Sequence, residues 1–257
     1  MVRLGQNFLA DTNLLDAIVR EAAIDPGDVV LEVGGGEGVL TRELAARAVT
    51  VHVIELDERL RSGLERVAAD GDVRLHFGDA MRLDLAALDP APTRMVSNLP
   101  YSIATPLVLR TIAELQGIGS WTLMVQREIA DRLRAAPGSR TYGAPSVLVQ
   151  LSCEVRLLRA VERAVFKPRP RVDSALIGLR RVGPPAEPAV VALVREAFAH
   201  RRKSLARSLE LARPGIRDAA RESLARMGLP EDARAERLAP AQFEALAAEL
   251  ASVDAAR

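Results

Sequence analysis

The stretch Val29-Val30-Leu31-Glu32-Val33-Gly34-Gly35-Gly36-Glu37-Gly38 decides the fold, because a strand-like apolar run leads straight into a glycine-rich turn. A helical pattern over 38–47 follows at once, so the glycines occupy a strand-to-helix turn. Glycine has no side chain and lets the backbone approach a ligand closely. Val39 stands where a dinucleotide fingerprint has its last glycine, which favours a methyl-donor loop over an NAD loop. A purely structural glycine turn is the alternative.

Strand-like runs alternate with amphipathic helical runs on both sides of this turn, which predicts a doubly wound α/β domain with a mostly parallel sheet. The expected strands are 29–33, 50–55, 73–77, 94–98, 122–126, 146–153 and 175–181. The expected helices are 12–23, 38–47, 56–69, 105–114 and 128–134.

A Gly183-Pro184-Pro185 stretch ends this alternation. Beyond it the pattern is only helical, with expected helices at 189–211, 214–227 and 240–251. We therefore predict an α/β domain over 1–183, which would hold any active site at its sheet edge, and a small all-helical domain over 184–257.

Composition and charge narrow the class of protein. Of 257 residues, 49% are hydrophobic and 27% are charged, as in an ordinary globular protein with a sizeable core. The segment 110–182 holds 13 Lys and Arg against 6 Asp and Glu, which fits either a surface facing a polyanion or arginines scattered over solvated faces. With Cys153 as its single cysteine, no signal-peptide pattern and no apolar run of about 18 residues, we expect a cytoplasmic protein without a membrane span. We also expect a monomer.

Acidic residues stand at the ends of the next two expected strands. Glu55 lies 21 positions after Gly34, where a carboxylate can bind both hydroxyls of a ribose. Asp79 follows the third strand, where it can accept a hydrogen bond from the exocyclic amine of adenine. Because the ends of neighbouring strands meet at one edge of the sheet, these residues predict an adenosine site, with Leu56 and Ala80 beside them.

The fourth expected strand ends in Asn98-Leu99-Pro100-Tyr101, a pattern suited to a methyl acceptor. The adenine amine is a poor nucleophile, because its lone pair is delocalised into the ring. The Asn98 side-chain oxygen and the Leu99 carbonyl oxygen would accept hydrogen bonds from its two N–H groups and so favour a pyramidal nitrogen. Pro100 would stiffen the turn, and Tyr101 would stack on a base taken out of its helix. A β-turn with a core tyrosine is the alternative.

A stiff proline-rich loop over 166–174 combines one aromatic residue with three cations. Phe166 would close over the other face of the base, and the cations would meet phosphates. The alternative is a plain connection with Phe166 buried. A second basic group on the first tail helix is either another phosphate contact or a solvated face. The candidate RNA-binding residues are Lys167, Arg169, Arg171, Arg201, Arg202 and Lys203.

Taken together, the motifs resemble the ribosomal RNA adenine dimethyltransferase family over essentially the whole chain. They are 4–9 (Leu-Gly-Gln-Asn-Phe-Leu), the glycine turn, 98–101, 166–174 and 198–209. The chain looks most similar to the KsgA-type branch that modifies small-subunit RNA, and less to the macrolide-resistance enzymes of 23S RNA. The resemblance implies a Rossmann-like class I methyltransferase sheet, S-adenosylmethionine as methyl donor, and dimethylation of two adjacent adenines near the 3′ end of 16S rRNA during ribosome biogenesis.

The resemblance also carries site residues over to matching positions. Gln6, Asn7 and Leu9 would border the methyl donor, and its main contacts would be Gly34, Gly36, Glu55, Asp79 and Asn98. Departures from the family pattern are Gly35 in place of a proline, Ser102 in place of an asparagine, and a nearly absent basic N-terminal extension.

Rival interpretations come from other classes of protein. An NAD-dependent dehydrogenase would use the same sheet, but Val39 and the lack of a catalytic His or Lys near a strand end argue against it. A non-catalytic RNA-binding assembly factor would keep the donor site, yet the intact 98–101 motif argues against a loss of chemistry. We expect no metal, because His52, His76 and His200 lack the spacing of metal ligands.

Overall fold

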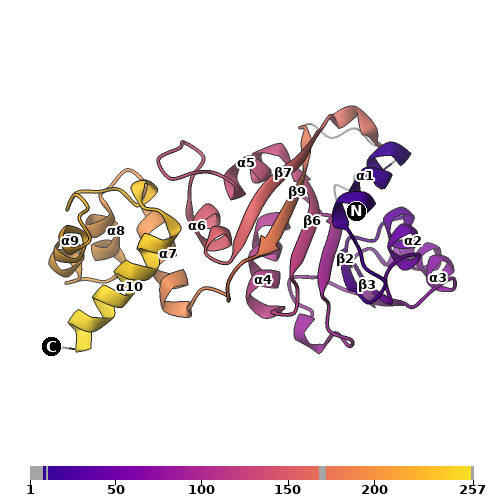
Figure 1. Ribbon diagram of the computed structural model, residues 1–257, viewed down its shortest axis with the longest axis horizontal. Helices are drawn as coiled ribbons and strands as arrows, with labels where there is room; N and C mark the ends of the chain where they lie inside the picture. The colour runs from indigo at the N-terminus through magenta and orange to yellow at the C-terminus, as the bar shows by residue number, and fades with distance from the viewer. Residues whose placement is uncertain (1–7, 10, 168–171, 256–257) are drawn as a thin grey trace. The chain divides into compact units, whose positions relative to one another are not determined.

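A computed structural model describes residues 8–9, 11–167 and 172–255, with the backbone alone described at 8, 9, 164, 166, 167 and 253–255. Its centre is a seven-stranded sheet (Figure 1). The strands are β2 (Val29–Val33), β3 (Thr50–Glu55), β4 (Val73–Phe77), β5 (Arg94–Asn98), β6 (Ser120–Gln126), β7 (Cys153–Val161) and β9 (Ser174–Arg181). They are arranged in the order β4-β3-β2-β5-β6-β9-β7, and only the pairings of β9 are antiparallel.

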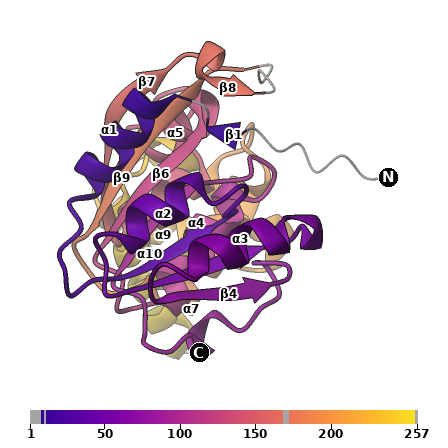
Figure 2. The same ribbon diagram turned by 90° about the vertical axis from the view of Figure 1, so that its right-hand side faces the viewer.

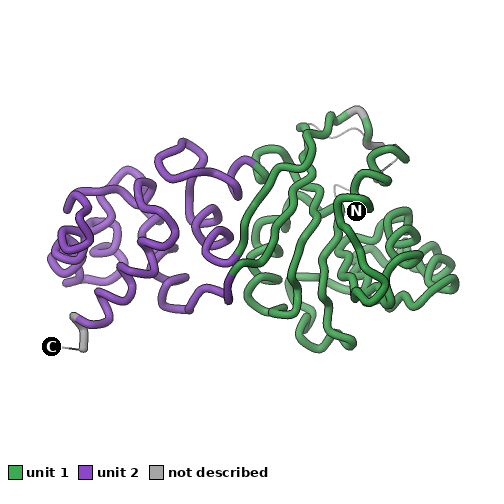
Figure 3. The backbone as a smooth tube through the Cα atoms, viewed as in Figure 1, with its two compact units in different colours: residues 1–130, 153–182 green, residues 131–152, 183–257 purple. Residues whose placement is uncertain are grey.

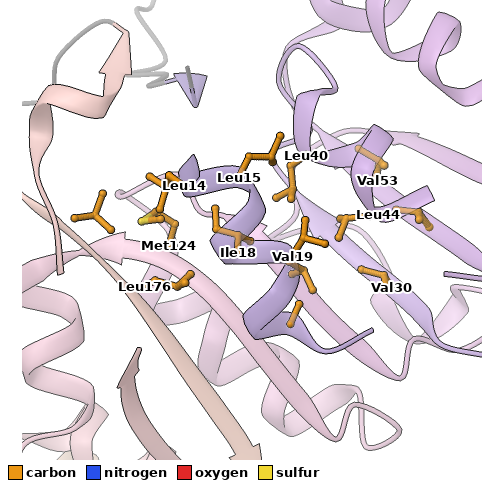
Figure 4. Packing of buried hydrophobic residues seen from close by; sticks show 14 of the residues in the cluster. Leu14, Leu15, Ile18, Val19, Val30, Leu40, Leu44, Val53, Met124 and Leu176 are labelled. Atoms are coloured by element: carbon orange, nitrogen blue, oxygen red, sulfur yellow. The ribbon is translucent and has the colours of Figure 1, made fainter. Parts of the chain in front are cut away.

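Every residue of β2 and β3 is buried, as expected for parallel strands covered on both faces. One face packs on α1 (Thr12–Ala22), α2 (Val39–Ala45) and α3 (Arg61–Ala68). Figure 4 shows Leu14 and Ile18 of α1 close to Met124 of β6 and Leu176 of β9. Helix α3 contacts both α2 and β4, as Figure 2 shows at the β4 edge.

The opposite face of the sheet is covered by α4 (Ala104–Glu114). Successive side chains of a strand point to opposite faces, so Trp121 lies on the other side from Met124. The indole Nε1 of Trp121 donates to Thr111 Oγ1 of α4 at 3.1 Å, which fixes the helix on that side. The sequence prediction of a doubly wound α/β sheet is therefore confirmed.

A second, two-stranded sheet joins β1 (Phe8–Leu9) to β8 (Phe166–Lys167), with Leu9 opposite Phe166. This pairing brings the last two residues of the N-terminal motif next to the first two of the proline-rich loop, although 157 positions separate Leu9 from Phe166. The sequence pattern contained no sign of it, since a two-residue strand is too short to give a period.

The chain forms two compact units, residues 1–130 with 153–182 and residues 131–152 with 183–257 (Figure 3). The expected division between 183 and 184 put 131–152 in the first domain. In the structure this segment packs with the tail, because α6 contacts α7 and α10 and the Tyr142 hydroxyl donates to the Leu238 carbonyl at 2.9 Å. The remaining helices are α5 (Arg127–Leu133), α6 (Ala144–Gln150), α7 (Pro188–Ala199), α8 (Leu205–Ala212), α9 (Arg217–Arg226) and α10 (Pro240–Ala255). Short 3-10 helices are η1 (Glu58–Leu60), η2 (Leu85–Ala87), η3 (Arg163–Val165) and η4 (Ala235–Arg237).

Two expected elements are wrong. The expected strand 146–153 is mainly helix α6, whose apolar residues are buried on all sides and so give no helical period. The Ser146 hydroxyl accepts from the Gly143 N–H at 3.0 Å and donates to the Arg132 carbonyl at 2.6 Å, which favours the helical start. The expected helix 189–211 is two helices, because Ser204 caps α8 by accepting from Arg207 N.

Candidate active site

A pocket opens at the carboxyl ends of β2, β3, β4 and β5, which are neighbours in the sheet. Open α/β sheets bind ligands at this edge, so its position agrees with a nucleotide site. Its lining residues all belong to the first unit. They are Glu32, Val33, Gly34, Gly35, Gly36, Glu37, Val39, Leu40, Ile54, Glu55, Leu56, Gly78, Asp79, Ala80, Asn98, Leu99, Pro100, Tyr101, Ser102 and Ile103.

The glycine turn forms one wall of the pocket. Gly34, Gly36 and Gly38 have φ angles of 86°, 57° and 78°, a left-handed region that favours glycine. A Cβ atom at Gly34 would lie 3.3 Å from Pro100 Cδ and 3.6 Å from the backbone oxygen of Asn98. The turn therefore packs directly against the 98–101 motif, and any larger residue at Gly34 would separate them.

Glu55 lies at the end of β3 and is only 5% exposed. Its Oε2 accepts from the Gly36 N–H at 2.9 Å, and its Oε1 accepts from the Asp57 N–H at 2.8 Å. Two backbone donors thus fix the carboxylate in one orientation. Each oxygen keeps a further lone pair, so the group can still accept two hydroxyl hydrogen bonds from a ribose.

Asp79 follows β4 through Gly78 and lines the pocket beside Ala80. Its Oδ1 accepts from the Met81 N–H at 2.8 Å, while Oδ2 lies 3.5 Å from Arg82 Nε. The Asp79 side chain is 40% exposed, so its carboxylate remains accessible to a donor group. Leu56, at 53% exposure, presents an apolar side chain to the same pocket.

The acceptor motif forms the opposite wall. Asn98 ends β5 and is half-buried at the pocket, and the Leu99 N–H donates to the Met124 carbonyl at 3.1 Å. The Tyr101 hydroxyl lies 2.7 Å from Ser174 Oγ, and burial raises the pKa of Tyr101. Ser174 is 1% exposed and belongs to the other sequence motif, so a single hydrogen bond links the two motifs.

Glu32 is a pocket residue that the sequence reasoning missed. Its Oε2 accepts from the Thr41 hydroxyl at 2.6 Å. Burial raises the pKa of Glu32 to about 8, opposed by the Thr41 hydrogen bond and assisted by the negative charge of Glu55. A carboxyl group inside an apolar strand, two positions before the glycine turn, was the available signal. Ser102 and Ile103 were also missed and line the pocket after Tyr101.

Several predicted site residues are not placed by the structure. Gln6, Asn7, Arg169 and Arg171 lie outside the described residues. For Leu9, Phe166 and Lys167 only the backbone pairing of β1 and β8 is described.

The sequence analysis placed Arg201, Arg202 and Lys203 on the first tail helix, but they lie in the turn between α7 and α8. All three are exposed residues of the second unit. The Arg201 guanidinium donates to the carbonyls of Arg140 at 3.2 Å and Tyr142 at 2.8 Å. Arg201 thus already holds a loop of its own unit, whereas Arg202 and Lys203 extend the basic character of the turn.

Among the described residues, no group of three His, Cys, Asp or Glu side chains is arranged to hold a metal ion. His52 Nδ1 lies 3.0 Å from His76 Nε2, and His52 Nε2 lies 2.9 Å from the Pro90 carbonyl oxygen. The described helices also include none with the length and apolarity required to cross a bilayer.

The sheet, its covering helices and the pocket define a Rossmann-like methyltransferase. A solved dimethyladenosine transferase from Plasmodium falciparum superposes with a TM-score of 0.81 at 26% identity, covering 95% of this chain and 98% of that one. The 23S rRNA methyltransferase ErmE superposes with a TM-score of 0.70 at 29% identity, covering 95% of this chain and 100% of that one.

Sequence relatives narrow the class further. The family model described as ribosomal RNA adenine dimethylase matches residues 2–252, so the chain belongs to this family. A relative from Rubrobacter xylanophilus, named ribosomal RNA small subunit methyltransferase A, is 46% identical over 95% of this chain and 92% of its own length. A relative of the same name from Deinococcus radiodurans is 42% identical over 97% of this chain and 85% of its own length.

Proposed function

We propose that this protein transfers methyl groups from S-adenosylmethionine to the N6 amine of two adjacent adenines near the 3′ end of 16S rRNA. The observation that carries the proposal is the packing of Gly34 on Pro100, with 3.3 Å between the Cβ position and Cδ, because it joins a nucleotide turn to an acceptor motif in one pocket. Membership of the dimethylase family supports the reaction, and the small-subunit names of the relatives support the substrate.

The donor side of the pocket suits a cationic adenosine derivative. Glu55 is oriented to accept the ribose hydroxyls, and Asp79 to accept from the purine amine. Glu32 adds a carboxyl group that favours a positively charged ligand once it is ionised. When bound, S-adenosylmethionine supplies an electrophilic methyl group on a sulfonium, and no metal is part of the proposal.

The acceptor side holds the adenine amine. In this proposal the Asn98 side-chain oxygen and the Leu99 carbonyl oxygen accept hydrogen bonds from its N–H groups. The nitrogen lone pair is then less delocalised into the ring as the transition state develops. The nitrogen bonds to the methyl carbon while the carbon–sulfur bond breaks to a neutral thioether, and a proton leaves the nitrogen for solvent. Tyr101 and Phe166 stack on the two faces of the extruded base.

Basic residues would bind the RNA backbone. Lys167, Arg169 and Arg171 follow the acceptor site in the proline-rich loop, and Arg202 and Lys203 belong to the helical unit. Phosphate contacts give affinity that is independent of sequence and falls with salt. The enzyme in this proposal acts as a monomer in the cytoplasm, where ribosomal particles are assembled.

The test is mass spectrometry of nucleosides from unmethylated small-subunit particles, after incubation with protein and S-adenosylmethionine. We expect N6,N6-dimethyladenosine with the wild-type chain, and a loss of about 100-fold or more in rate for Asn98→Ala and Tyr101→Ala. Glu55→Ala should mainly raise the dissociation constant of the donor. Arg20→Ala, at a side chain 71% exposed on α1, is the control and should change neither quantity.

Unchanged rates in both Asn98→Ala and Tyr101→Ala would contradict the acceptor assignment. Donor binding without any transfer would favour the assembly-factor alternative. Large-subunit particles belong in the same experiment, because ErmE at 29% identity is a 23S rRNA methyltransferase. Transfer to those particles alone would move the substrate to 23S RNA.

A further inference from the structure

Arg110 ties the Asp79 loop of the pocket to helix α4 from a position outside the pocket lining. It lies on α4 and its side chain is 16% exposed. Nη1 donates to the Ala80 carbonyl at 2.7 Å, and Nη2 donates to the Leu83 carbonyl at 2.8 Å. Nε donates to Glu114 Oε1 at 2.8 Å, so all three nitrogens of the guanidinium are used.

The two carbonyls belong to the loop that carries the proposed purine contact. Residues 79–83 form one turn, in which the Arg82 and Leu83 N–H groups donate to the Asp79 carbonyl at 2.8 and 3.0 Å. A single turn has no following turn to bond its later carbonyls, and Arg110 provides donors for them. Hydrogen bonds from a charged donor are stronger than neutral ones, and these two tie the loop to α4.

The other end of α4 adjoins the acceptor motif. The helix begins at Ala104, and the Ile103 N–H before it donates to the Pro100 carbonyl at 3.2 Å. The helix that follows the acceptor motif therefore also carries the side chain that holds the donor loop. A planar guanidinium suits this task, because it presents two parallel donors that a lysine cannot present.

We propose that Arg110 is a positioning residue that sets the purine specificity of the donor site, by holding the Asp79 loop against α4. The inference rests on the proposed function in one respect, the assignment of Asp79 to the purine amine. It predicts that discrimination between an amino and a keto group on the purine depends on Arg110, although Arg110 is not a lining residue of the pocket.

The experiment measures dissociation constants by calorimetry for S-adenosylhomocysteine and its deaminated analogue S-inosylhomocysteine, using the full chain. The wild-type protein should prefer the adenosyl ligand, because a keto oxygen cannot donate to Asp79. Asp79→Asn should remove most of this preference. Arg110→Met should lower the preference for the adenosyl ligand by about fivefold or more, as expected for the loss of charge-assisted hydrogen bonds. Arg110→Lys should have a preference between those of wild type and Arg110→Met.

Arg94→Met is the matched control. The Arg94 side chain is 22% exposed, donates to the Ala22 carbonyl and pairs with Asp25 and Asp28. Arg94 begins β5, whereas Asn98 at the pocket ends it. It should lower thermal stability while leaving the ligand preference within about twofold of wild type. The double variant Asp79→Asn/Arg110→Met should lose no more preference than Asp79→Asn alone, because both changes act on one contact.

A wild-type preference in Arg110→Met, with a reduced one in Asp79→Asn, would overturn the role of Arg110 and leave the proposed function intact. A wild-type preference in Asp79→Asn would instead show that Asp79 does not contact the purine amine. The positioning role of Arg110 would then fail as well. If Arg110→Met does not fold, Arg110→Gln is measured against the same criterion, because its amide keeps a donor without the charge.

Discussion

At the scale of single residues, Glu32 joins stability to the pocket. The pKa of Glu32 is about 8 in the folded protein and 4.5 in the unfolded chain. Between these two pH values the folded protein therefore keeps a proton that the unfolded chain has released. Folding is therefore penalised progressively as pH rises from about 4.5 to 8, and the full penalty remains at higher pH. The carboxyl group is kept in spite of this cost, which fits a residue that serves the ligand more than the fold.

Glu32→Gln should remove this penalty, because an amide can accept the Thr41 hydroxyl without ionising. The variant should match wild type near pH 4.5 and become more stable than wild type as pH rises to 9, by on the order of a few kcal/mol. Urea denaturation at several pH values measures the difference. Stability curves that run parallel from pH 5 to 9 would contradict the raised pKa.

The hydrogen bond between Tyr101 and Ser174 predicts that both side chains act as one unit. Tyr101→Phe and Ser174→Ala should each slow methyl transfer by about threefold to tenfold, because the ring loses its anchor, while donor affinity stays constant. The double variant should be no slower than the slower single variant. Fully additive losses in single-turnover rates would mean that Ser174 does not act through Tyr101.

At the scale of elements, β3 and β4 are joined by a chain of imidazoles. The Pro90 carbonyl can only accept, so Nε2 of His52 carries the proton and Nδ1 accepts from Nε2 of His76. Burial lowers the pKa of both histidines, with Arg74 lowering both further and with Asp72 and Asp89 opposing the shift at His52. The hydrogen bond between the rings is lost only when both are protonated, because two N–H groups would then face each other.

This pair should make the β3–β4 edge sensitive to acid. A histidine pKa that is lower in the folded state means that stability is lost as pH falls below the unfolded value of about 6.5. His76→Gln keeps a donor for His52 and removes one titrating group, so its stability should fall less than that of wild type between pH 7.5 and 5. Thermal denaturation of the two proteins side by side checks this, and an equal fall in both would refute the pair as the cause.

At the scale of the whole molecule, the pocket belongs to the first compact unit and the exposed basic turn between α7 and α8 belongs to the second. Arg202→Gln/Lys203→Gln should weaken binding to small-subunit RNA. The slope of the logarithm of the binding constant against the logarithm of salt concentration should become shallower by up to about two, one for each charge removed. Donor affinity should stay unchanged, since neither residue lines the pocket. RNA-binding titrations at several salt concentrations measure the slope, and a wild-type slope would exclude this turn from the RNA contact.

Local signals predicted most of the first unit correctly. The strand–glycine–helix pattern at 29–47 depends on neighbouring residues alone, and each strand from β2 to β6 begins within two residues of its expected start. Helix α6 was mistaken for a strand, because burial on all sides removes the polar face that gives a helix its period. The contact of 131–152 with the tail was missed for a related reason, since local pattern does not say which distant element covers an apolar surface.

The sequence by itself determined the class of fold, the strands that carry the site and the residues at their ends, because each is written in short-range periodicity and turn chemistry. Only the tertiary structure decided which of those residues meet. The Gly34–Pro100 contact, the Tyr101–Ser174 hydrogen bond and the two bonds from Arg110 to the Asp79 loop join residues that are 27 to 73 positions apart. Such pairings follow from the packing of helices on a sheet, where free energy depends on distance in space and not along the chain.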